Sequence, residues 1–212
     1  MILIVIGSSG AGKSSILKQI DLERKTTTTT RDIRLEDGEV EGIDYYYISK
    51  EKFNQLKEKN GFIETDEFGG EQYGTEVSIL ENIDTTDISI ILTPEGAKSL
   101  QTYCKENNII SKTVLLTLPK EKIKERLLKR GDRPEKIKKR LKAEVENPIA
   151  DKAHILKEKG ELIIDLEIPT EKYSMNEVIK QINILIKPYI KEKKTIKKPK
   201  KGQKKQKNNF NK

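Results

Sequence analysis

The chain has 212 residues, of which 36% are charged and 34% hydrophobic, and its formal net charge is +8. This length suffices for one domain with a hydrophobic core. Residues 191–212 contain eleven lysines and one glutamate, so that segment carries +10 and residues 1–190 carry −2. A single cysteine, Cys104, excludes an internal disulfide. No apolar run approaches the length of a membrane span, and Met1 leads directly into an apolar run without a secretory leader pattern, so we expect a cytoplasmic protein.

The first element is predicted to be a strand of a parallel sheet. Residues 2–6 form a continuous, mostly β-branched apolar run, which is typical of strands buried on both faces. The pattern Gly7-x-x-x-x-Gly12-Lys13-Ser14 follows, and residues 16–20 have helical apolar spacing. Glycines let backbone N–H groups turn inward, and a helix N-terminus favours an anion. A strand–turn–helix that merely contains glycines is the alternative, but the flanks on both sides favour a phosphate-binding P-loop.

A P-loop implies that the phosphates of a nucleotide bind here, with Mg²⁺ as a cofactor. The Lys13 ammonium is expected to reach the outer phosphates and to act in catalysis, and the Ser14 hydroxyl is expected to bind the metal. The predicted ATP-binding residues are Gly7, Gly10, Ala11, Gly12, Lys13, Ser14 and Ser15.

Extended chain is predicted after the first helix. Five consecutive threonines, residues 26–30, disfavour a helix, which we expect to end near Arg24. Arg31 and Arg34 follow, and they are either a solvated surface pair or a second anion site beside the hydroxyls. A strand is expected over residues 43–48, a helix over 49–59, and an extended segment over 62–75 that turns at two glycines.

The second half of the chain alternates strands with helices, which predicts a doubly wound α/β sheet. Strands are expected over residues 88–92, 113–117 and 162–165, and helices over 94–104, 119–130, 134–157 and 175–189. His154 is a lone histidine without a partner at metal-binding or catalytic spacing, so we interpret it as structural.

Several motifs in register resemble the guanylate kinase family over roughly residues 1–188. They are Arg31-x-x-Arg34, Gly38-Glu39-Val40-x-Gly42-x-Asp44-Tyr45, Phe62-Ile63-Glu64, Glu67-Phe68-x-Gly70-x-x-Tyr73-Gly74-Thr75, Arg126-Leu127-x-x-Arg130-Gly131 and Ile137-x-x-Arg140-Leu141-x-x-Glu144. The resemblance implies an α/β fold with a P-loop NTPase-type parallel sheet core, an inserted subdomain that binds a nucleoside monophosphate (NMP), and a helical lid. We expect the core at 1–24, 80–128 and 147–190, the NMP-binding subdomain at 25–79, the lid at 129–146, and a basic disordered tail at 191–212.

The resemblance also implies a role for each motif residue. Arg31 and Arg34 grip the monophosphate as guanidinium forks. Glu64 reads guanine, because a carboxylate accepts hydrogen bonds from both N1–H and the 2-amino group. The implied GMP-binding residues are Thr27, Arg31, Arg34, Tyr45, Glu64, Tyr73, Gly74 and Thr75. In the lid, Arg126, Arg130 and Arg140 neutralise charge on the transferred group and join Lys13 as catalytic residues, with Arg133 as a substitute for one of them.

The expected reaction is Mg-ATP-dependent phosphoryl transfer to GMP or dGMP. The chain departs from the family where Ile91 and Thr93 replace an Asp-x-Asp pair, and where Asp165-Leu166-Glu167 replaces Asn-Asp-Asp. The first departure favours a non-catalytic binding module as the alternative, and a kinase for another nucleotide or a phosphorylated sugar is a third reading. The tail is either a solubilising extension or a contact for nucleic acid or an anionic surface.

Overall fold

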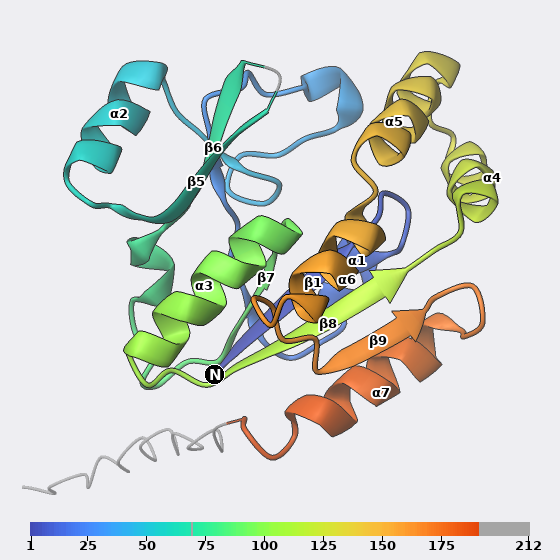
Figure 1. Ribbon diagram of the computed structural model, residues 1–212. Helices are drawn as coiled ribbons and strands as arrows, with labels where there is room; N and C mark the ends of the chain where they lie inside the picture. Colours follow the sequence, from blue (N-terminus) through green and yellow to red (C-terminus); the bar gives the residue numbers. More distant parts are fainter. Residues whose placement is uncertain (69, 191–212) are drawn as a thin grey trace, which may run out of the picture.

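The computed structural model describes residues 1–68 and 70–190 (Figure 1). Its core is a five-stranded sheet of order β2-β7-β1-β8-β9 in which every pairing is parallel. The strands are β1 (Ile2–Gly7), β2 (Glu23–Arg24), β7 (Ile88–Ile91), β8 (Ser111–Thr117) and β9 (Leu166–Pro169). The predicted parallel α/β core is confirmed.

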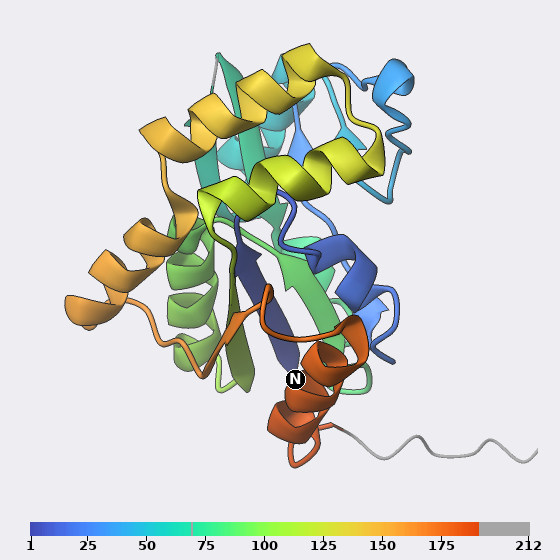
Figure 2. The same cartoon turned by 90° about the vertical axis from the view of Figure 1, so that its right-hand side faces the viewer.

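Helices cover both faces of this sheet (Figure 2). Leu3 and Val5 of β1 face a core shared with α1 (Lys13–Leu17) and α7 (Met175–Ile186). Ile4 and its alternate neighbours face a second core, shared with α3 (Pro94–Glu106) and α6 (Ile149–Glu158). Successive side chains of a strand point to opposite faces. A strand covered on both faces is therefore apolar at every position, as the β1 run is.

A second, four-stranded sheet has the order β4-β3-β6-β5. Its strands are β3 (Thr28–Thr29), β4 (Tyr46–Tyr47), β5 (Phe62–Phe68) and β6 (Glu71–Glu76), joined by η1 (Leu35–Asp37) and α2 (Lys50–Glu58) and followed by η2 (Val77–Leu80). The buried pair Thr28 and Thr29 shows how the threonine run, poor in a helix, serves as a strand. Phe53 of α2 stacks on Phe62 with ring centroids 4.4 Å apart and closes this small core.

Two further helices, α4 (Lys120–Arg130) and α5 (Pro134–Glu146), extend from the carboxyl end of β8. Gly131, in the left-handed region at φ +84°, ends α4 and lets the chain reverse. Figure 1 shows α5 and the small sheet above the same end of the parallel sheet. Ligands of open α/β sheets bind at this end.

Four predicted element boundaries were wrong. The strand expected over residues 43–48 is only β4 (Tyr46–Tyr47), because residues 42–44 form a turn. The first helix ends at Leu17 rather than near Arg24, because Glu23–Arg24 pairs with β7 as the edge strand β2. The helix expected over residues 134–157 is two helices, since Pro148 cannot donate a backbone hydrogen bond and starts α6. The last strand lies at Leu166–Pro169, where it pairs with β8; the apolar residues just before it include Leu162, which packs in the core without joining the sheet.

Across the described residues, no helix combines the length and apolar character needed to cross a membrane.

Candidate active site

The loop of residues 8–12 connects β1 to α1 at the carboxyl edge of the parallel sheet. Gly10 and Gly12 have φ of +78° and +92°, a region that side chains with a Cβ rarely adopt. A Cβ at Gly7 would lie 2.4 Å from the carbonyl oxygen of Leu116, which belongs to the neighbouring strand. The loop therefore requires glycine at all three positions.

Lys13 folds its side chain over this loop. Its ammonium donates hydrogen bonds to the carbonyl oxygens of Gly7 at 2.6 Å and Ser8 at 2.9 Å. Burial lowers the pKa of Lys13 to about 8, and the nearby charge of Glu144 opposes this lowering while that of Arg140 adds to it. The positive side chain in α1's first turn is thus held directly at the loop of residues 8–12.

Helix α5 contacts two successive serines of the loop. The Ser8 hydroxyl donates to Glu144 Oε1 at 2.7 Å, and both residues are buried. Arg140 Nη1 donates to the Ser9 hydroxyl at 2.7 Å. Arg140 and Glu144 are four residues apart and share a helix face. We assigned no role to Glu144 from the sequence. Its spacing of four residues from Arg140 was the signal that could have predicted that both side chains face the loop.

Replacing Glu144 by alanine should lower the free energy of unfolding by about 1–3 kcal/mol, because the Ser8 hydroxyl would lose its partner in a buried site. Chemical denaturation of the two proteins measures the difference. Glu146→Ala is the matched control, since Glu146 forms an exposed ion pair with Lys142 on the same helix. An effect of Glu144→Ala no larger than that of the control would contradict a structural role for the Ser8–Glu144 hydrogen bond.

The other two arginines predicted to be catalytic have different partners. Arg126 donates to the Gly10 carbonyl at 3.3 Å and, through Nη2, to the carbonyl of Thr170 at 2.7 Å. It thereby ties the loop after β9 to the P-loop, a contact of Thr170 that sequence reasoning missed. Arg130 forms a fork with Asp132 at 2.7 and 2.5 Å. Of the three predicted catalytic arginines, Arg126 and Arg140 thus contact the P-loop.

A basic and aromatic cluster lies on the small sheet. The Arg31 guanidinium is 5.4 Å from the ring centroid of Tyr45, and the Tyr45 ring meets Tyr73 edge to face at 5.9 Å. Glu39 accepts two hydrogen bonds from Arg31, at 2.8 and 3.0 Å. Among the described residues, the Arg34 guanidinium has no hydrogen bond or ion pair, while its backbone N–H donates to Glu39. The structure therefore brings Arg31, Tyr45 and Tyr73 together and adds Glu39, for which the sequence reasoning assigned no function.

Glu64 lies on β5 beside the first turn of α3. The Thr75 hydroxyl donates to Glu64 Oε1 at 2.6 Å, and an ideal Cβ at Gly96 would lie 3.5 Å from the same oxygen. Burial raises the pKa of Glu64, against the lowering effect of the Thr75 hydrogen bond. Gly74 permits the close approach of the Phe62 ring, which a Cβ would meet at 2.7 Å.

Thr27 is half-buried, and its carbonyl accepts from the Tyr46 backbone N–H at 2.9 Å. The Thr93 hydroxyl, at a position where the resemblance led us to expect an acid, caps α3 by accepting from the Gly96 N–H at 3.1 Å. Thr93 therefore acts as the N-cap of α3. His154, interpreted as structural, lies outside the loop and faces Glu167 at 3.0 Å.

A metal at this site would depend on few protein groups. The Ser14 hydroxyl is exposed at the start of α1, and it makes no hydrogen bond with the described residues. The described residues contain no group of three or more histidine, cysteine, aspartate or glutamate side chains arranged to hold a metal. Mg²⁺ commonly keeps several waters and takes its other oxygens from substrate phosphates and one or two protein groups. The Ser14 hydroxyl, at the end of the loop, fits this type of Mg²⁺ coordination.

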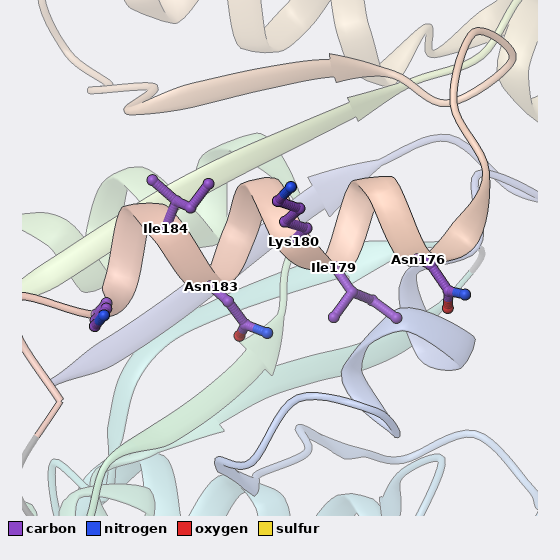
Figure 3. Close-up of a pocket in the computed structure, with 6 residues that line it drawn as sticks. Asn176, Ile179, Lys180, Asn183 and Ile184 are labelled. Carbon is purple, nitrogen blue, oxygen red and sulfur yellow. The ribbon is translucent and has the colours of Figure 1, made fainter.

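A separate surface cavity lies along one side of α7, lined by Asn176, Ile179, Lys180, Asn183, Ile184 and Lys187 (Figure 3). Its lining residues lie on α7, apart from Lys187, which follows the helix directly, and none belongs to the loop or the small sheet. The lysine-rich segment 191–212 lies outside the described residues, so its predicted contacts stay predictions.

Comparison with known proteins identifies similar chains. A sequence model of the family described as "Guanylate kinase" matches residues 1–159. The chain is 35% identical over 148 residues to a guanylate kinase of Prochlorococcus marinus (strain MIT 9312), covering 66% of this chain and 78% of the relative. It is 36% identical over 149 residues to a guanylate kinase of Clostridioides difficile (strain 630), covering 66% and 70%. The crystal structure of guanylate kinase from Anaplasma phagocytophilum shares the fold, with a TM-score of 0.61 at 23% identity, over 89% of this chain and 85% of that one.

Proposed function

Since this chain belongs to the guanylate kinase family, we propose that it transfers the terminal phosphoryl group of Mg-ATP to GMP or dGMP, giving ADP and GDP or dGDP. As a nucleoside monophosphate kinase it needs two phosphate sites, one for the donor and one for the acceptor. The P-loop suits the donor, and the basic and aromatic cluster on the small sheet suits the acceptor.

In the donor site, the backbone of the P-loop and the α1 N-terminus bind the phosphates of ATP. Lys13 neutralises charge between the outer phosphates, and the Ser14 hydroxyl would hold Mg²⁺. When bound, the metal would supply further neutralisation of the phosphate charge. Arg126 and Arg140 adjoin the loop and are suited to stabilise the charge of the transferred group, a task that dominates phosphoryl transfer. Arg130 reaches that group only if it releases Asp132.

In the acceptor site, Arg31 and Arg34 bind the monophosphate together with the hydroxyls of Tyr45 and Tyr73. Glu64 accepts from N1–H and the 2-amino group of guanine, with Thr27, Gly74 and Thr75 shaping the base pocket. The observation that carries this assignment is the half-buried Glu64 carboxylate, held by Thr75 on the same small sheet as the Arg31 cluster. The hydrogen bond from Thr75 fixes the orientation of the carboxylate. Its remaining lone pairs then have a fixed direction in which to accept hydrogen bonds from a base.

A coupled ADP-release assay with a panel of acceptors tests the proposal. GMP or dGMP should exceed AMP and CMP by at least about 100-fold in kcat/KM, because adenine leaves the Glu64 carboxylate facing a lone pair. Phosphorylated sugars belong in the same panel. Equal turnover of AMP and GMP would contradict the guanine assignment while leaving a kinase, and no turnover of any acceptor would support a non-catalytic binding module.

A further inference from the structure

Glu39 is the hydrogen-bonding centre of the cluster on the small sheet. Its carboxylate accepts from Arg31 Nη1 and Nη2 at 3.0 and 2.8 Å, from the Arg34 backbone N–H at 2.9 Å, and from the Tyr47 hydroxyl at 2.9 Å. Oε2 accepts three of these hydrogen bonds and Oε1 accepts one, so both oxygens act as acceptors, as in an ionised carboxylate. Burial alone would raise the pKa of Glu39, but these hydrogen bonds lower it. Glu39 is therefore an ionised group at neutral pH.

The contacts with Glu39 fix which edge of Arg31 faces a ligand. The end edge of the guanidinium, formed by Nη1 and Nη2, is turned to the carboxylate, and Nη1 also donates to the Asp32 carbonyl at 2.7 Å. These hydrogen bonds use three of the five N–H donors. The other two, on Nε and Nη2, form the side edge of the guanidinium, beside the Tyr73 hydroxyl, and match two oxygens of a phosphate. The guanidinium is held in this orientation by Tyr45 and Tyr47, whose ring centroids are 5.4 and 5.7 Å from it.

We propose that Glu39 is a positioning residue for the phosphate of the acceptor. It holds Arg31 by the end edge so that the side edge meets the phosphate, and it fixes the backbone of Arg34 at the start of η1. This inference rests on the proposed function, because the phosphate in question is that of the nucleoside monophosphate.

Two effects of a carboxylate beside an anion site have opposite signs. Its charge repels the phosphate, so that removal of the charge alone would tighten binding. Its hydrogen bonds orient Arg31, so that loss of those bonds weakens binding. The ion pair with Arg31 is largely shielded from water, with side-chain exposures of 11% and 17%. In this geometry the orienting effect dominates.

The test compares Glu39→Gln and Glu39→Asp with the unmodified protein. Glu39→Gln removes one of the two acceptor oxygens facing Arg31, and Glu39→Asp keeps the charge but withdraws the carboxylate by one methylene. Both should raise KM for GMP by about 10- to 100-fold, the scale of one hydrogen bond to a charged group. KM for ATP should stay within about 2-fold. The matched control is Glu41→Gln, which makes the same charge change at an exposed carboxylate contacting the Tyr47 backbone N–H at 3.3 Å.

A double-mutant cycle separates positioning from a general structural role. In an Arg31→Lys background, which lacks a fork to orient, Glu39→Gln should change KM for GMP by less than about 3-fold. Thermal unfolding of each variant shows whether it is folded at the assay temperature. If Glu39→Gln is unfolded there, Glu39→Asp replaces it in the cycle.

The inference would be overturned if KM for GMP were lower or unchanged in Glu39→Gln, or unchanged in Glu39→Asp. A rise in KM for ATP equal to the rise in KM for GMP would also overturn it. Failure of the unmodified protein to phosphorylate GMP would instead contradict the proposed function. Calorimetric titration of GMP into the unmodified and Glu39→Gln proteins tests the positioning role independently of turnover.

Discussion

Replacing Lys13 by alanine should reduce kcat for phosphoryl transfer by about 1,000-fold or more, on the scale of a group that stabilises transition-state charge. Its ammonium is already at the loop, 2.6 and 2.9 Å from the carbonyls of Gly7 and Ser8. Lys13 is half-buried, and this burial lowers its pKa to about 8. A charge there acts more strongly on a phosphate than one in water.

Steady-state kinetics with ATP and GMP measure the loss, and circular dichroism shows whether the fold is kept. Lys18→Ala is the matched control, because Lys18 lies at the other end of the same helix with an exposed side chain. Its turnover should stay within about 2-fold of the unmodified protein, as expected for a surface substitution far from the phosphates. Unchanged turnover in Lys13→Ala would show that the P-loop is not the donor site.

Replacing Glu64 by glutamine should reduce the preference for GMP over AMP from at least about 100-fold to about 10-fold or less, while KM for ATP stays nearly constant. An amide has one acceptor oxygen, and its NH₂ group opposes one of the two guanine donors. The ratio of kcat/KM for the two acceptors is the measurement. Glu67→Gln, an exposed position on the same strand β5, is the control and should leave the ratio unchanged.

The preference for GMP should also depend on pH. Burial raises the pKa of Glu64, so its carboxylate becomes protonated at a higher pH than an exposed glutamate. The protonated form cannot accept from two guanine donors. The GMP to AMP ratio of the unmodified protein should therefore fall as the pH falls through this raised pKa, and Glu64→Gln should lack that dependence. A ratio that is flat across this range in both proteins would contradict base reading by Glu64.

The local signals of the chain were sufficient for the core. A strand buried on both faces needs an apolar residue at each position. The continuous apolar run of residues 2–6 predicted such a strand, and its residues lie in the cores on both faces of the sheet. The three glycines, Lys13 and Ser14 lie close together in sequence because they belong to one connection, from the end of β1 to the first turn of α1. The resemblance to a family extended this to Arg31, Tyr45, Tyr73 and Glu64. The structure does place the first three in one cluster and Glu64 on the same small sheet.

Only the tertiary structure decided which side chains support these residues. Glu144 reaches Ser8 across 136 positions of the chain, and Arg126 reaches Thr170 across 44. Glu23–Arg24 becomes a strand through pairing with β7, against its position at the end of a helical pattern. Glu39 became the centre of the Arg31 cluster because Tyr47 and the Arg34 backbone converge on it. Sequence periodicity reports which face of an element is buried, whereas hydrogen bonds between distant segments depend on how the elements pack.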